Sequence, residues 1–145
     1  GIHTHSIPVL PFEDNSLDLI SAFSVFTHIE AFDTAWIMEF RRILRPGGIA
    51  WLTVHSENTW EDVREGWPLH MGLNGLDGYE PDPAKRAPLT DPRKVFRWRA
   101  DASYSSNVFY TFEHLRSTWG RIMPVKEEIS RELGFQDIVI LQKPR

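Results

Sequence analysis

The spacing of apolar residues changes twice between positions 17 and 54. Residues 17–23 (LDLISAF) form a short, nearly continuous apolar run, which is typical of a strand buried on both faces of a parallel sheet. Apolar residues then recur every three or four positions, as on one stripe of a helix: Ile29, Phe32, Trp36, Phe40, Ile43 and Leu44. A second apolar run at 49–54 follows at once. The pattern predicts a strand, a helix and a second strand parallel to the first.

Local signals mark both ends of the predicted helix. Thr27 and Glu30 have the spacing of a capping box, in which the threonine caps the first turn and the glutamate reaches back. At the other end, Pro46 disfavours helical geometry in the residue before it, and a following glycine can supply a left-handed cap. We therefore expect the helix to lie between these signals, with its aromatic stripe packed on the sheet.

Segment 56–103 has no sustained period, because glycines and prolines interrupt it repeatedly. Residues 58–61 (NTWE) predict a helix start of one or two turns. Residues 93–99 (RKVFRWR) favour an amphipathic strand or a pocket wall, although basic and aromatic residues also alternate in single-strand nucleic-acid binders. The segment is too apolar to stay solvated without cost. We interpret it as a long, partly ordered loop or lid insertion.

The last part of the chain, 104–145, predicts a helix followed by two strands. The helix is expected near 113–120, with Leu115 and Trp119 on its buried face. A short strand is expected at 122–125, and the β-branched run 135–142 is the clearest strand of this half. The chain thus reads as one domain with a strand-helix-strand core (1–55), an insertion (56–103) and a terminal helix with a strand pair (104–145).

Composition narrows the class of protein. With 145 residues, 41% of them hydrophobic and 12% aromatic, the chain can fill one core. A net charge of −4 gives no basic footprint for nucleic acid, and no apolar run is long enough for a membrane span. The absence of cysteine excludes disulfides and thiolate sites and fits a cytoplasmic location. His3 and His5 lack a third ligand nearby, so we predict no metal site.

Four linked motifs resemble one enzyme family. In chain order they are residues 10–12 (LPF), 14–20 (DNSLDLI), 24–29 (SVFTHI), and Glu39 followed by 42–48 (RILRPGG). Their order and spacing resemble the second half of class I S-adenosylmethionine-dependent methyltransferases of the methyltransferase type 11 group. The resemblance is dense over 7–55, absent over 56–103 and fainter over 110–143. It implies an α/β, partial Rossmann-like fold: the second half of a seven-stranded sheet, with parallel strands and a terminal antiparallel pair whose last strand lies between the two before it.

The resemblance also implies S-adenosyl-L-methionine as cofactor and a methyl acceptor that stays unidentified, a small-molecule substrate or another kind of molecule. The residues that would flank the cofactor are Ser6, Ile7, Ser24, Val25, Phe26 and His28. Either His28 contacts the cofactor or acceptor directly, or it pins the loop. His55 ends the second strand, where ligand-facing groups of such sheets project, so it is the candidate catalytic base or acceptor-binding residue; the alternative is that it only belongs to a capped loop start. Trp60 and Tyr110 are further candidates for binding the acceptor.

The family's glycine-rich turn and the acidic residue that follows it do not occur in these 145 residues. Because Gly1 falls near the end of the family's third strand, we expect the first half of the domain to be missing and the strand at 17–23 to have an open edge. Such an edge predicts a homodimer. The alternative to an enzyme is a non-catalytic interaction module that associates through this edge. No dinucleotide fingerprint supports an oxidoreductase.

Overall fold

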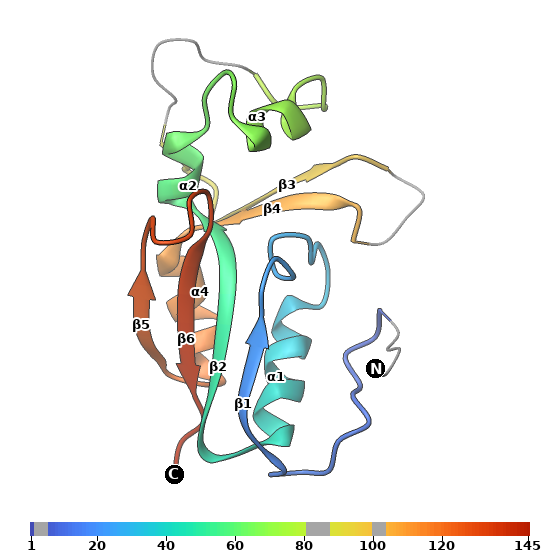
Figure 1. Ribbon diagram of the computed structural model, residues 1–145, viewed down its shortest axis with the longest axis vertical. Helices are drawn as coiled ribbons and strands as arrows, with labels where there is room; N and C mark the ends of the chain where they lie inside the picture. The colour runs from blue at the N-terminus through green and yellow to red at the C-terminus, as the bar shows by residue number, and fades with distance from the viewer. Residues whose placement is uncertain (2–5, 81–87, 100–103) are drawn as a thin grey trace.

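The fold is centred on one long strand. The structure is a computed structural model that describes residues 1, 6–80, 88–99 and 104–145, so His3 and His5 lie outside the described residues. Strand β2 (Leu44–Ser56) lies between β1 (Leu17–Ala22) and β6 (Asp137–Gln142), parallel to the former and antiparallel to the latter (Figure 1). Strand β5 (Val125–Ile129) pairs antiparallel with the other edge of β6. The predicted α/β class, the parallel pair and the terminal antiparallel pair are confirmed.

Helices cover one face of this sheet. The crossover helix α1 (Asp33–Ile43) connects β1 to β2, and α4 (Phe112–Ser117) with the short 3₁₀ helix η1 (Trp119–Arg121) packs beside it, both behind the sheet in Figure 1. The core between these layers contains Phe26, Phe40, Leu52, Val54, Leu115 and Trp119. Burial of Leu115 and Trp119 confirms the predicted inner face of the terminal helix.

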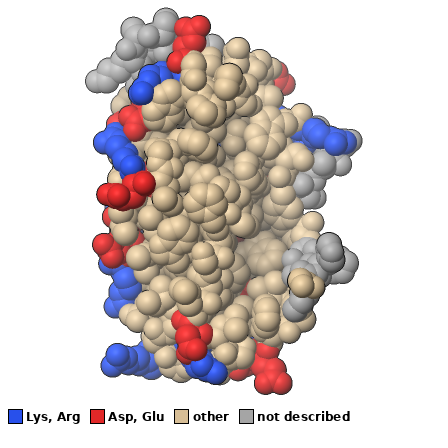
Figure 2. All heavy atoms as spheres, in the orientation of Figure 1, with Lys and Arg blue, Asp and Glu red and all other residues tan. Residues whose placement is uncertain are grey.

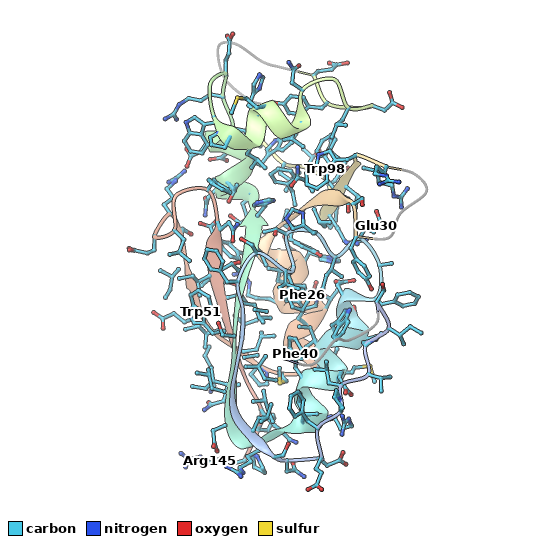
Figure 3. All side chains as sticks on the ribbon, turned by 45° about the vertical axis from the view of Figure 1, so that its right-hand side comes forward. Phe26, Glu30, Phe40, Trp51, Trp98 and Arg145 are labelled. Carbon is cyan, nitrogen blue, oxygen red and sulfur yellow. The ribbon has the colours of Figure 1, made fainter. Side chains whose placement is uncertain are left out.

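The opposite face of the sheet is left open by the described residues. Leu19 and Phe23 are 60% and 59% exposed, and Trp51 points to this side whereas Phe26 and Phe40 lie between the sheet and α1 (Figure 3). Figure 2 shows a broad surface with few charged side chains, which gather at its margins. Within the described part of the chain, β1 pairs only with β2. The expected open edge is therefore present.

Segment 56–103 contains more regular structure than a loop. It holds α2 (Glu57–Asp62), α3 (Pro68–Leu73) and β3 (Arg93–Arg97), and β3 pairs antiparallel with β4 (Ser106–Tyr110). The strand expected at 93–99 is thus confirmed. Trp60 stacks on Phe96 with ring centroids 5.8 Å apart and meets Phe109 edge-on. These rings form a second core, which explains why so apolar a segment is ordered.

The predicted capping box is wrong. Helix α1 begins after Phe32, which has a φ of 62°, and no side chain of the described residues caps it. The carbonyl of Thr27 instead accepts the amide of Val108 at 2.9 Å, and the carboxylate of Glu30 pairs with Arg97 at 2.9 Å. Contacts with β3 and β4 thus override the local capping signal.

Two other boundaries differ from expectation. The strand expected at 122–125 begins only at Val125, because the amide of Met123 still bonds to the carbonyl of Trp119 and continues the helical turn. Helix α1 ends at Ile43, and the left-handed glycine is Gly47, with a φ of 84°, inside the start of β2 rather than at the helix cap. The RPGG motif therefore shapes the first residues of β2.

An ionic clamp holds the loop before β1 on helix α1. Glu39 accepts the amide of Leu10 at 2.7 Å and the guanidinium of Arg42 at 2.7 and 2.8 Å. Arg42 also donates to the carbonyl of Phe12 at 2.8 Å and to the carboxylate of Asp14 at 2.7 Å. The hydrogen bonds from Arg42 lower the pKa of Glu39. The LPF, DNS and E-x-x-R motifs are thus parts of one contact.

Two properties of the described residues concern membranes and metal ions. None of the helices there is long and apolar enough to cross a membrane. No group of three or more histidine and acidic side chains in the same residues could hold a metal ion.

Candidate functional site

A cavity of about 730 Å³, the first cavity, opens at the carboxyl end of β1. Its walls come from β1, the loop 23–29 and α1, are mostly apolar, and include Phe26 and Phe40, which are labelled in Figure 3. Its size is that of a small-molecule site. The predicted cofactor-flanking residues that line it are Ser6, Ser24, Val25, Phe26 and His28. Ile7 does not line it and is 64% exposed.

Ser24 sits at the mouth of this cavity in a strained backbone conformation. Its φ is 54°, a region that costs a residue with a side chain roughly 1–2 kcal/mol. Two neighbouring segments hold it there: its amide donates to Thr53 Oγ1 at 2.8 Å, and Gln136 Nε2 donates to its hydroxyl at 2.6 Å. Backbone strain maintained by such contacts is typical of functional sites.

His28 is fixed by strand β4. Its Nδ1–H donates to the carbonyl of Ser106 at 2.7 Å, and the hydroxyl of Ser106 donates to the carbonyl of His28 at 3.4 Å. Tyr110 adds a hydrogen bond from its hydroxyl to the carbonyl of Ile29 at 3.2 Å. Because a carbonyl can only accept, Nδ1 carries a proton, so Nε2 is the nitrogen that holds the lone pair when the ring is neutral.

A smaller cavity of about 260 Å³, the second cavity, shares two lining residues with the first cavity. Ser24 and His28 line both cavities. The second cavity is lined by residues at the ends of β2 and β4, residues of helix α3, Trp98 and the residues before β6. No lysine, arginine, aspartate or glutamate is among the described residues that line it.

His55, the predicted base, lines the second cavity and is only 2% exposed. Its ring lies 5.1 Å from that of Phe109 and 6.3 Å from that of Phe135. Burial, assisted by the nearby charge of His28, lowers the pKa of His55 to about 3. His55 is therefore neutral at neutral pH and a weak proton acceptor. Its catalytic role stays a prediction.

Trp60 and Tyr110 lie in packed cores and line neither of these two cavities. Trp60 is 7% exposed and packs among the rings of the second core. Tyr110 is fully buried, and this burial raises the pKa of its hydroxyl. Their predicted contact with an acceptor is not tested and stays a prediction.

Two residues of the second cavity were missed in the sequence. Asn107 is 2% exposed and Gln136 is 6% exposed, and each has one side-chain polar atom without a partner in the described structure. Their only sequence signal is an amide side chain beside the apolar run of a strand. His55, Asn107 and Gln136 are brought together only because β4 and β6 both pair with β2.

Comparison with known proteins places this geometry in a family context. The model of the methyltransferase domain family matches residues 2–52. An S-adenosylmethionine-dependent methyltransferase from Mesorhizobium loti aligns over 94% of this chain and 66% of its own, with a TM-score of 0.59 and 12% identity. A methyltransferase from Methanosarcina mazei aligns over 97% and 65%, with a TM-score of 0.55 and 16% identity. The chain resembles class I methyltransferases in sequence and in fold.

A third solved structure with this methyltransferase fold contains ligands. It is the 1,6-didemethyltoxoflavin-N1-methyltransferase of Burkholderia thailandensis with bound 1,6-didemethyltoxoflavin and S-adenosylhomocysteine. It aligns over 96% of this chain and 48% of its own, with a TM-score of 0.55 and 10% identity. The chain thus spans about half to two thirds of these structures. No curated protein matches it.

Proposed function

We propose that this chain forms the acceptor-side half of an S-adenosylmethionine-dependent methyltransferase. The observation that carries the proposal is the meeting of two cavities at Ser24 and His28. They meet at the carboxyl ends of parallel strands, where open α/β sheets bind ligands. In this arrangement the first cavity receives the cofactor and the second receives the methyl acceptor.

The lining of the first cavity fits part of S-adenosylmethionine. Its apolar walls suit the adenine and the methyl-bearing end, and the buried indole Nε1 of Trp36 lacks a partner among the described residues and can donate to a ligand. The hydroxyls of Ser6 and Ser21 add polar contacts. No acidic residue for the ribose hydroxyls is among the described lining residues. When bound, the cofactor supplies an electrophilic methyl group.

The residues between the cavities would handle the proton that the acceptor loses. We assign proton acceptance to Nε2 of His28, because Nδ1 is already committed to Ser106. We assign His55, the predicted base, to acceptor binding as a neutral hydrogen-bonding group, since its lowered pKa opposes protonation. Trp98 lies 5.4 Å from the His28 ring and closes that side against water.

Calorimetric titration of the 145-residue chain with S-adenosylhomocysteine tests the cofactor site. We expect micromolar binding, weakened about tenfold or more in Val25→Trp, whose indole would fill the first cavity. Val9→Trp is the matched control, because Val9 is also exposed but does not line the cavity. Absence of heat at millimolar ligand, or equal weakening by both variants, would contradict the proposed cofactor site.

His28→Asn separates a base from a loop pin. The asparagine amide can still donate to the Ser106 carbonyl but offers no imidazole lone pair. Transfer of label from tritiated S-adenosylmethionine to small molecules of a cell extract should fall about 100-fold or more, as expected for loss of a general base. Affinity for S-adenosylhomocysteine should stay unchanged. A variant with full transfer activity would eliminate His28 as the proton acceptor.

The open edge of β1 favours a second candidate function, that of an interaction module. We infer that a second copy of the chain pairs with this edge, because its backbone groups are unpaired within the described residues and Leu19 beside them is exposed. Sedimentation velocity should show a dimer that Leu19→Lys converts to monomer. A monomer at all concentrations in the parent chain would contradict the homodimer.

A further inference from the structure

Three side chains that line the second cavity each have a buried polar atom that makes no hydrogen bond within the described structure. These atoms are Nδ1 of His55, the amide nitrogen of Asn107 and the amide oxygen of Gln136. The three side chains are 2%, 2% and 6% exposed, so bulk water does not satisfy them. Buried polar groups are almost always hydrogen-bonded, and each exception calls for an unseen partner. Three exceptions on one cavity indicate that the partner is a ligand.

The missing partner must form hydrogen bonds with two amide atoms of opposite hydrogen-bonding character. The Asn107 nitrogen is a donor and needs an acceptor, whereas the Gln136 oxygen is an acceptor and needs a donor. The other end of the Gln136 amide already binds the Ser24 hydroxyl at 2.6 Å, which fixes its orientation. A ligand that carries a donor and an acceptor side by side would satisfy both.

The remaining walls exclude charge and favour a flat ring. The cavity has no acidic or basic residue among its described lining residues, so a charged ligand would be desolvated without a counterion. Aromatic faces come from His55, Phe135 and Trp98. Trp98 is tied across the cavity by its Nε1–H, which donates to the carbonyl of Gly72 at 2.8 Å.

We propose that the second cavity selects an uncharged, planar methyl acceptor with an adjacent hydrogen-bond donor and acceptor, as in an aromatic carboxamide or lactam. The selectivity arises from Asn107, Gln136 and His55, which are all neutral polar groups. This inference rests on the proposed function, because it names the class of acceptor for the same site.

Substitution of Gly72 by alanine would reduce the volume of this cavity without a steric clash. A Cβ on Gly72 would lie 3.9 Å from the Asn107 amide nitrogen, an ordinary contact, and Gly72 has no left-handed backbone. Gly72→Ala therefore narrows the space beside Asn107 without strain. Gly120→Ala is the matched control, because its Cβ would also meet only ordinary contacts and Gly120 lies outside the cavity.

The experiment titrates the 145-residue chain, with and without S-adenosylhomocysteine, with four probes of similar shape: benzamide, benzoate, benzamidinium and acetophenone. We expect benzamide to bind about tenfold or more tightly than either charged probe and more tightly than acetophenone, which lacks the donor. Gly72→Ala should abolish this binding and Gly120→Ala should not. Gln136→Leu should remove the preference for benzamide over acetophenone.

The outcomes separate this inference from the proposed function. If the chain binds S-adenosylhomocysteine but does not bind benzamide, or binds benzoate more tightly than benzamide, the proposed class of acceptor is overturned and the proposed cofactor site is not affected. If the chain binds benzamide but has no affinity for S-adenosylhomocysteine, the ligand site is supported and the proposed methyltransferase function is contradicted. Binding of benzamide that Gly72→Ala does not weaken places it outside the second cavity and overturns the inference.

Discussion

The molecule holds two groups of buried polar side chains that differ in whether their hydrogen bonds are made. At one end of the sheet, Glu39 is 8% exposed and its carboxylate accepts from Leu10 and Arg42. At the other end, His55 and Asn107 are more deeply buried, yet each has a polar atom without a partner among the described residues. The first group has the geometry of a structural contact. The second group has the geometry of a site that is available to a ligand.

This difference teaches how to separate structure from function in the chain. A cluster of buried polar groups that are all hydrogen-bonded stabilises the fold. Removing one member is destabilising because it leaves the other members without their partner. An unsatisfied cluster lowers stability, and removing one member costs the fold little but removes a contact for a ligand. Three substitutions test this contrast, one at the satisfied end and two at the unsatisfied end.

The largest effect is expected for Glu39→Ala. It removes the acceptor shared by Leu10 and Arg42, so the free energy of unfolding should fall by about 3 kcal/mol. The melting temperature should fall by about 5–10 °C for a domain of this size. Glu13→Ala is the control, because Glu13 is exposed, and it should change stability by less than about 0.5 kcal/mol. Similar losses in the two variants by urea unfolding would remove the structural role assigned to the clamp.

The second effect, for His55→Gln, depends on pH. In the folded state His55 has a pKa of about 3, below its unfolded value of about 6.5, so the unfolded chain binds the extra proton between these values. Stability of the parent chain should therefore be complete above about pH 6.5 and decrease as the pH falls towards 3. Between about pH 7.5 and 5, the parent should lose about 2 kcal/mol more than the variant.

His55→Gln keeps a neutral hydrogen-bonding side chain, so the comparison isolates the titration. Unfolding by urea at several pH values measures it, and other groups that titrate, such as His114, cancel because both proteins contain them. Parallel curves for parent and variant would mean that His55 is hydrated enough to accept a proton. The assignment of proton acceptance to His28 rather than His55 would then lose its basis.

The same contrast explains which features could be predicted from the sequence. Strand β1, strand β2, the stripe of α1 and strand β6 follow from local periods, and the structure confirms them. The predicted capping box of Thr27 and Glu30 does not form, because both residues instead contact strands that are distant in sequence. Thr27 bonds to β4 and Glu30 pairs with β3. Strand β4 and helix α3 were not expected at all. Period-based reasoning captures elements that bury one face and misses those that are fixed by packing.

The candidate site divides in the same way. The residues after β1 that were expected at the cofactor, such as Ser24 and His28, come from one contiguous motif, so sequence alone could group them. Asn107 lies in β4 and Gln136 immediately precedes β6, and only the pairing of β2 with β4 and β6 brings them to His55. Trp60 and Tyr110 are candidates for binding the acceptor because of their aromatic side chains, but aromatic side chains in this chain mostly pack in the two hydrophobic cores.

The smallest effect is expected for Asn107→Leu. Leucine has the branched shape and the number of side-chain heavy atoms of asparagine but no amide, so it removes a buried donor that has no partner among the described residues and adds apolar surface to the second cavity. The free energy of unfolding should stay within about 1 kcal/mol of the parent and increase rather than decrease. Thermal unfolding measures this, with Asn58→Leu as a control that breaks the hydrogen bond to Ser130 at an exposed site. A loss above about 2 kcal/mol would mean that the Asn107 amide is satisfied in the folded chain, by water or by backbone, because only a satisfied buried donor is costly to remove. The cavity would then be a hydrated part of the fold and not a prepared acceptor site, so this small change decides the contrast between the two polar groups.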